Sequence, residues 1–173
     1  MSSNSNRTQY IAKGGLFTAV GIILVYISGI IPINKTCLLA AASFIIPLSI
    51  ITTNVRNTLA VYAATSLLSL LLCGIKMTVL AYILFFGLYG IVKFYIEKIQ
   101  KIIVEIILKL AFLNICTVIL LLIYRLFFPG IFNFRFSMHW IILGLQIVFL
   151  LYDYLLTLII NFINKRLYRK NLY

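Results

Sequence analysis

Six apolar runs, each close to the length needed to cross a bilayer, constrain this chain more than any other feature of its sequence. A membrane-spanning helix needs about 20 predominantly apolar residues. The predicted spans cover residues 11–31, 37–53, 58–75, 77–96, 104–128 and 141–163. We assign them to a single transmembrane domain over residues 1–173. The sequence therefore predicts an all-α integral membrane protein, a compact bundle of six transmembrane helices.

The composition supports a membrane protein over a soluble one. Apolar and aromatic residues make up 64% of the chain and charged residues only 10%, whereas a soluble domain is about 45–50% apolar and about a quarter charged. A soluble chain of 173 residues could not bury so much apolar surface, because its surface-to-volume ratio is too high. Lipid must cover the remainder.

The segment KFYIEKIQKIIVEIILK, residues 93–109, is the most charged part of the chain before its C-terminal tail. Lysine and glutamate alternate in it at a spacing of four: Lys93, Glu97, Lys101, Glu105 and Lys109. On a helix this spacing forms one charged row. One interpretation is an amphipathic helix on the membrane surface. The other, which we favour, divides the segment between two span ends, with a turn near Lys98 to Lys101, so that Lys109 enters the membrane.

The distribution of basic residues predicts the orientation, since an even number of spans places both termini on one side. That side receives eleven of the fifteen basic residues: Arg7, Lys13, Arg56, Lys93, Lys98, Lys101, Lys109, Lys165, Arg166, Arg169 and Lys170. The opposite side receives four: Lys35, Lys76, Arg125 and Arg135. Because cytoplasmic loops carry the excess of lysine and arginine, we expect a multi-pass protein of the cell membrane with both termini cytoplasmic. Basic residues at span ends are not a nucleic-acid footprint, which needs a basic patch on a polar domain.

The titratable residues argue against an enzyme and against a metal site. The three cysteines lie singly, without a CxxC pair, and their odd number argues against a disulfide framework. One histidine, His139, and three carboxylates are too few for a His/Asp/Glu cluster. The sequence therefore predicts no catalysis, no metal and no cofactor. A membrane enzyme that acts on lipid or peptide through His139 is the less favoured alternative.

One acidic residue lies where a charge is costly. Asp153 falls near the middle of the sixth span, in LLYDYLL, and a charge there costs several kcal/mol unless it is paired or hydrated. Lys109 and Lys93, in the inner halves of other spans, are the candidate partners. We predict an intramembrane polar pair of Asp153 with Lys109, whose role is either functional or a structural lock on helix packing.

A second set of polar and aromatic residues gathers at the outer ends of the spans. The candidates for substrate binding are Asn34, Lys76, Tyr82, Arg125, His139 and Gln146. Small-molecule sites are mostly apolar, with a few polar groups that orient the ligand. The alternative is a belt of interfacial aromatic side chains and snorkelling cations, which accounts for Arg125 well and for Gln146 poorly.

Two segments carry a resemblance to a known family. The opening TQYIAKGGLFTAVGIILVYISGIIP has small residues at Ala12, Gly15 and Ala19 and is followed by a short Pro-containing outer turn, and LAVYAATSLLSLLL covers Leu59–Leu72. Together with six spans in a chain of this length, they resemble the S components of energy-coupling factor (ECF) transporters. These are the membrane-embedded, substrate-binding subunits of ABC-type vitamin importers.

The resemblance implies a function and a set of partners. It implies a pocket near the outer face, roofed by the first loop and framed by the last three spans, with Asn34, His139 and Gln146 as pocket candidates. The face with Ala12, Gly15 and Ala19 would dock on a transmembrane coupling subunit driven by two ATPases. The last span has few polar residues, which argues against a strongly polar vitamin. A moderately apolar or aromatic substrate, or an anion attracted by Lys76 and Arg125, fits better.

The competing class is a membrane protein that transports nothing. As an assembly, scaffold or regulatory subunit, it would use Asp153 and the small-residue face to bind another membrane protein. The outer polar residues would then form only an interfacial belt. The partner that copurifies with the protein, and whether a small molecule is bound, distinguishes the two classes.

Overall fold

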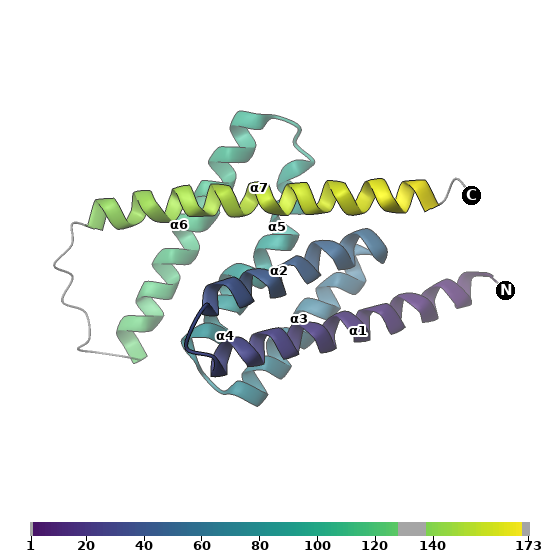
Figure 1. Cartoon of the computed structure of the whole chain (residues 1–173), viewed down its shortest axis with the longest axis horizontal. Coiled ribbons are helices and arrows are strands. Elements are labelled where there is room, and N and C mark those ends of the chain that lie inside the picture. The colour runs from purple at the N-terminus through teal and green to yellow at the C-terminus, as the bar shows by residue number, and fades with distance from the viewer. Residues whose placement is uncertain (1, 128–137, 171–173) are drawn as a thin grey trace. The chain divides into compact units, whose positions relative to one another are not determined.

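The computed structural model describes residues 2–127 and 138–170, and every regular element in these ranges is helical (Figure 1). The elements are α1 (Ser2–Ile30), α2 (Lys35–Thr52), α3 (Val55–Cys73), α4 (Met77–Ala81), the π-helix η1 (Tyr82–Gly87), α5 (Leu88–Glu97), α6 (Ile102–Phe127) and α7 (Met138–Lys170). The elements α4, η1 and α5 follow one another without a break and form one membrane-spanning helix.

Among the residues that the structure describes, six helices are long and apolar enough to cross a membrane. Their candidate spans are Thr8–Ile30, Lys35–Thr52, Val55–Cys73, Met77–Glu97, Ile102–Phe127 and Ile142–Lys165. The predicted fold class, an all-α protein with six membrane-spanning helices, is confirmed. The first helix begins nine residues before its predicted span, and the last continues seven residues beyond its own. A hydropathy pattern locates the apolar part of a helix, whereas polar residues can extend the same helix into water.

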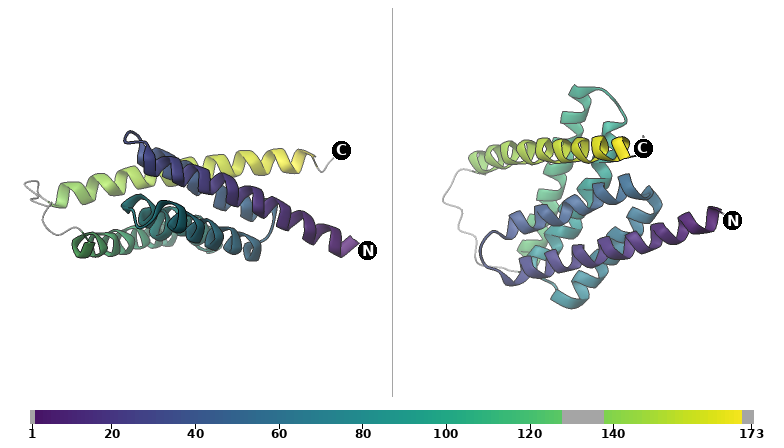
Figure 2. Two further views of the ribbon diagram at one scale, coloured as in Figure 1. Left: turned by 90° about the horizontal axis from the view of Figure 1, so that it is seen from below. Right: turned by 45° about the vertical axis from the view of Figure 1, so that its right-hand side comes forward.

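The chain divides into two compact units, Met1–Glu105 and Ile106–Tyr173. In the first unit α1 packs against both α2 and α3 (Figure 2). A cluster of buried residues joins α2, α3 and α5 in its core: Ile46, Val61 and Ile91, with Phe17 and Tyr62 packed against them. In the second unit α6 and α7 bring an ion pair together, which is described with the candidate site.

Glycines permit close helix contacts in the first unit, and Gly21, Gly87 and Gly90 give the tightest of them. A Cβ at Gly21 of α1 would lie 2.8 Å from Thr65 Cγ2, and one at Gly87 would lie 2.8 Å from the ring of Tyr62. At Gly90 of α5, a Cβ would meet the side chain of Ile46 at 2.8 Å. Without a hydrophobic driving force between helices in lipid, such close approach supplies the packing energy.

The charged segment 93–109 forms two helix ends joined by a turn, so a single surface helix over its whole length is wrong. Glu97 ends α5 and Ile102 begins α6. Gln100, in the turn between them, has the left-handed φ of 55°. The turn interrupts the row of alternating charges, which leaves Lys93 in α5 and Lys109 in α6.

The fourth span contains a π-helical segment that the sequence pattern did not predict. Residues Tyr82–Gly87 form η1 between α4 and α5. The Tyr62 hydroxyl of α3 donates a 2.9 Å hydrogen bond to the carbonyl of Ile83 inside η1. Because π segments are rare and occur frequently at functional sites, this part of the first unit is of interest for function.

Candidate functional site

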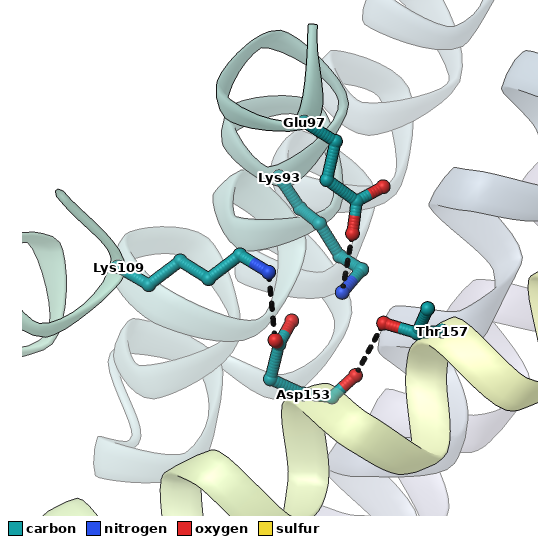
Figure 3. Close-up of polar contacts among 5 residues, drawn as sticks. All are labelled: Lys93, Glu97, Lys109, Asp153 and Thr157. Carbon is teal, nitrogen blue, oxygen red and sulfur yellow. Dashed lines mark hydrogen bonds and ion pairs between the residues drawn. The ribbon is translucent and has the colours of Figure 1, made fainter. Parts of the chain in front are cut away.

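Two charged side chains meet inside the second unit. Lys109 Nζ of α6 lies 2.7 Å from Asp153 Oδ2 of α7; the Lys109 side chain is buried, with 7% of its surface exposed, and the Asp153 side chain is largely buried, with 13% exposed (Figure 3). Asp153 lies eleven residues after the start of its span at Ile142 and twelve before its end at Lys165, about 16–18 Å of helix from either end. The structure thus brings the predicted pair together in the middle of the last span.

The ion pair occupies the buried face of each helix. Leu113 and Cys116 follow Lys109 at helical spacing and are buried, and Phe149 and Leu156 flank Asp153 and are buried in the same way. Removal of these two charges from water is costly, and a short, hydrogen-bonded contact compensates part of the cost. The Thr157 hydroxyl donates to the backbone carbonyl of Asp153 at 3.0 Å (Figure 3).

The second candidate partner of Asp153 is engaged in its own unit. Lys93 of α5 is 1% exposed, and its Nζ lies 2.9 Å from Glu97 Oε1, one turn further along the same helix (Figure 3). A carboxylate four residues away is the expected partner for a lysine on a helix. Close to this pair in sequence, Lys98 Nζ lies 4.9 Å from the centre of the Phe94 ring, a distance suited to a cation–π interaction.

The predicted substrate-binding residues do not share one environment. Asn34, Lys76 and Arg125 are exposed at helix ends, and Gln146 is half-buried on α7. His139 lies in the first turn of α7, but its side chain is outside the described residues. Tyr82 differs from the rest because it is fully buried, so it does not belong to an interfacial belt.

Tyr82 belongs to a polar contact between α3 and the fourth span. Its hydroxyl donates to Thr65 Oγ1 at 3.2 Å, and Thr65 in turn donates to the carbonyl of Val61 at 2.8 Å. Thr65 also meets Gly21 of α1, so one threonine contacts three helices. Sequence reasoning missed Thr65, because threonines are common in spans and only the glycine opposite it distinguishes this one.

Three hydroxyls near this contact are buried without a hydrogen bond. Ser66 Oγ and Ser69 Oγ of α3 and Thr78 Oγ1 of α4 have no partner among the described residues. Unpaired hydroxyls are uncommon in protein interiors, and each costs about 1–3 kcal/mol. The sequence carried no signal for them, because a serine or threonine in a span ordinarily bonds to a carbonyl of its own helix.

Helix α1 carries small residues on two faces. Gly14 and Gly21 face α3 of the same unit. A Cβ added at Gly14 would lie 2.9 Å from Asn57 Nδ2, and one added at Gly21 would lie 2.8 Å from Thr65 Cγ2. The predicted docking residues Ala12, Gly15 and Ala19 are exposed. Nothing in the described chain lies within 4 Å of a Cβ at Gly15.

The described residues contain no group of three or more His, Cys, Asp or Glu side chains that could hold a metal ion. Fold and polar contacts together define a multi-pass α-helical membrane protein with an intramembrane ion pair. Comparisons with models of known protein families, with curated proteins and with solved structures gave no match.

Proposed function

We propose that this protein is the membrane-embedded substrate-binding subunit of an ECF-type importer for a small molecule such as a vitamin. In this role it resides in the cell membrane with both termini cytoplasmic and catalyses no reaction itself. It binds its substrate near the outer face and docks, through α1, on a transmembrane coupling subunit that two ATPases drive.

The observation that carries the proposal is the uncovered small-residue face of α1. Ala12, Gly15 and Ala19 are exposed on a membrane-spanning helix, so either lipid or another membrane protein covers them. Lipid packs equally well against large apolar side chains. The neighbouring residue Leu16 has such a side chain and is exposed. Small residues are useful where a second helix approaches closely. The face therefore suits a helix of a partner protein.

The pairing of Asp153 weakens the competing class. A scaffold or assembly subunit would use this acid to bind another membrane protein, yet its carboxylate lies 2.7 Å from Lys109 of the same chain. The α1 face would still serve such a subunit, so the identity of the partner decides between the two classes.

The test is purification of the tagged protein from the membranes of its own cells, with two matched variants. Gly15→Leu places a large side chain on the α1 face, and Gly144→Leu places the same side chain on α7, where a Cβ likewise meets nothing within 4 Å. We expect a complex with ATPase activity from the wild type and from Gly144→Leu, and loss of that complex in Gly15→Leu.

Two results would overturn the proposal. One is a stable partner without ATPase activity, combined with no small molecule bound to the purified protein, which favours the assembly subunit. The other is loss of an enzymatic activity on lipid or peptide in His139→Ala at unchanged expression, which favours the enzyme.

A further inference from the structure

Most hydroxyls inside the first unit are satisfied by a carbonyl of their own helix. Thr18 donates to Gly14, Ser28 to Val25, and Thr65 to Val61, at 2.7–2.9 Å. Ser43 donates to Ala40 at 2.8 Å. Ser69 is fully buried and departs from this pattern, as do the oxygens of Ser66 and Thr78. Ser69 and Thr78 are the two of these three residues nearest to the turn at residues 74–76, and an unpaired hydroxyl in an apolar surrounding can bind a polar group of a ligand.

Two of the unpaired hydroxyls, those of Ser69 and Thr78, lie at a similar depth of the first unit. The bond between Tyr82 and Thr65 gives the register of α3 against the fourth span, and the chain reverses between them at residues 74–76. Ser69 comes four residues after Thr65, and Thr78 comes four residues before Tyr82. Each therefore lies about 6 Å along its helix axis from the bonded residue of the same helix, toward the turn at residues 74–76.

A glycine and a lysine complete the surroundings. A Cβ at Gly29 of α1 would lie 3.8 Å from Thr78 Oγ1 and 3.9 Å from Lys76 Cδ. Lys76 is exposed at the turn before α4. The chain's three acidic residues, Glu97, Glu105 and Asp153, all lie elsewhere in the sequence. Two hydroxyl donors and an ammonium group with no nearby acid in the sequence form a set suited to an anion.

We propose that Ser69, Thr78 and Lys76 form a subsite for the carboxylate of a small organic acid. This rests on the proposed function and names the class of substrate. The two hydroxyls donate hydrogen bonds to the carboxylate oxygens, and the ammonium of Lys76 forms a charge-assisted pair with them. Both hydroxyl oxygens are buried in this structure, so the acid reaches them only when the side-chain packing around Gly29 opens.

Cysteine labelling tests the subsite on the full chain in lipid vesicles, after Cys37, Cys73 and Cys116 are replaced by alanine. The probe is the anionic reagent 2-sulfonatoethyl methanethiosulfonate. We expect Ser69→Cys and Thr78→Cys to react about tenfold faster than Ser43→Cys, a buried control whose native hydroxyl is already satisfied. Lys76→Gln should slow both reactions about tenfold, as expected for the loss of one charge-assisted hydrogen bond.

The ligand class is tested by protection. Butyrate should slow the labelling of Ser69→Cys, and butylamine, a cation with the same hydrocarbon chain, should not. Equal protection by the two compounds overturns the acid, and labelling of Ser69→Cys no faster than that of Ser43→Cys overturns the subsite.

A second measurement needs no cysteine variant. Butyrate should raise the thermal unfolding temperature of the wild type, because a ligand that binds only the folded state stabilises it. The rise should be absent in Lys76→Gln. A rise of the same size in Lys76→Gln contradicts the role of the lysine.

These assays use the isolated chain, so their outcome is independent of the coupling complex. Failure of the proposed function appears as a purified protein without an ATPase-bearing partner, while the labelling pattern is retained. Failure of the subsite appears as unreactive Ser69→Cys in a protein that still forms the complex.

Discussion

At the scale of single residues, the ion pair of Lys109 with Asp153 makes the clearest energetic prediction. Lys109→Leu or Asp153→Leu alone leaves one buried charge without its partner and should destabilise the protein by about 3–5 kcal/mol. The double variant removes both charges and should be close to the wild type in stability. Unfolding of the detergent-solubilised protein, arranged as a double-mutant cycle, measures the coupling. A double variant as unstable as the sum of the two single variants would show that the pair contributes nothing.

The contact of Gly21 with Thr65 gives a second residue-level prediction. In Gly21→Val the added Cβ would lie 2.8 Å from Thr65 Cγ2, and displacement of Thr65 also disturbs its bond with Tyr82. We expect a loss of about 1–3 kcal/mol, typical of an overpacked core. Gly15→Val is the matched control, since its side chain meets open space, and thermal unfolding by circular dichroism compares the two. Equal stability of the two variants would contradict the described packing of α1 on α3.

Contacts of single residues could be predicted only where the sequence offers few candidate partners. An acid in the middle of an apolar span needs a partner, and few lysines lie at a suitable depth, so Asp153 and Lys109 could be named in advance. Burial of Tyr82 could not, because tyrosine is equally suited to a membrane interface and to a core. Thr65 could not be predicted either, because its contacts involve three helices and the sequence does not show that these helices pack together.

At the scale of elements, the π-helix in the fourth span accepts a hydrogen bond from a side chain outside it. Tyr62→Phe keeps the ring that packs on Gly87 but removes the hydroxyl that donates to the carbonyl of Ile83. We expect a loss of about 1–2 kcal/mol in the free energy of unfolding, because a carbonyl is left with one donor fewer in an apolar setting. Tyr154→Phe, at an exposed position, should have no effect in the same denaturation assay. An unchanged Tyr62→Phe protein would show that the bond does not stabilise η1.

Elements were predictable because lipid imposes one rule on all of them. Every backbone polar group must bond within its segment, so an apolar run of sufficient length becomes a helix whatever its propensities. The turn at residues 98–101 follows from the same rule, because the charged residues of the 93–109 segment are most easily accommodated near span ends. The π segment breaks no such rule, since both helix types satisfy the backbone, and nothing in YILFFG distinguishes it from α-helix.

At the scale of the whole molecule, a native cysteine can test the orientation. Cys37 is exposed in the first turn of α2, and the distribution of lysine and arginine predicts that this turn lies outside the cell. In a background of Cys73→Ser and Cys116→Ser, a membrane-impermeant maleimide should label Cys37 in intact cells, and Cys37→Ser should abolish the label. Labelling only in inside-out vesicles would reverse the assigned orientation.

The short distance between Lys109 and Asp153 has a consequence for how the chain is made. Each of these charges would oppose entry of its helix into the bilayer by about 2.5–3.5 kcal/mol if the helix left the translocon alone. The hydroxyls of the first three helices that bond to carbonyls of their own helices impose no such requirement, so those segments can partition into lipid one by one. The last two helices would therefore enter the bilayer most favourably together, as a hairpin, because Lys109 is then paired with Asp153 when the two helices leave the translocon. The ion pair would then belong as much to biogenesis as to the finished protein.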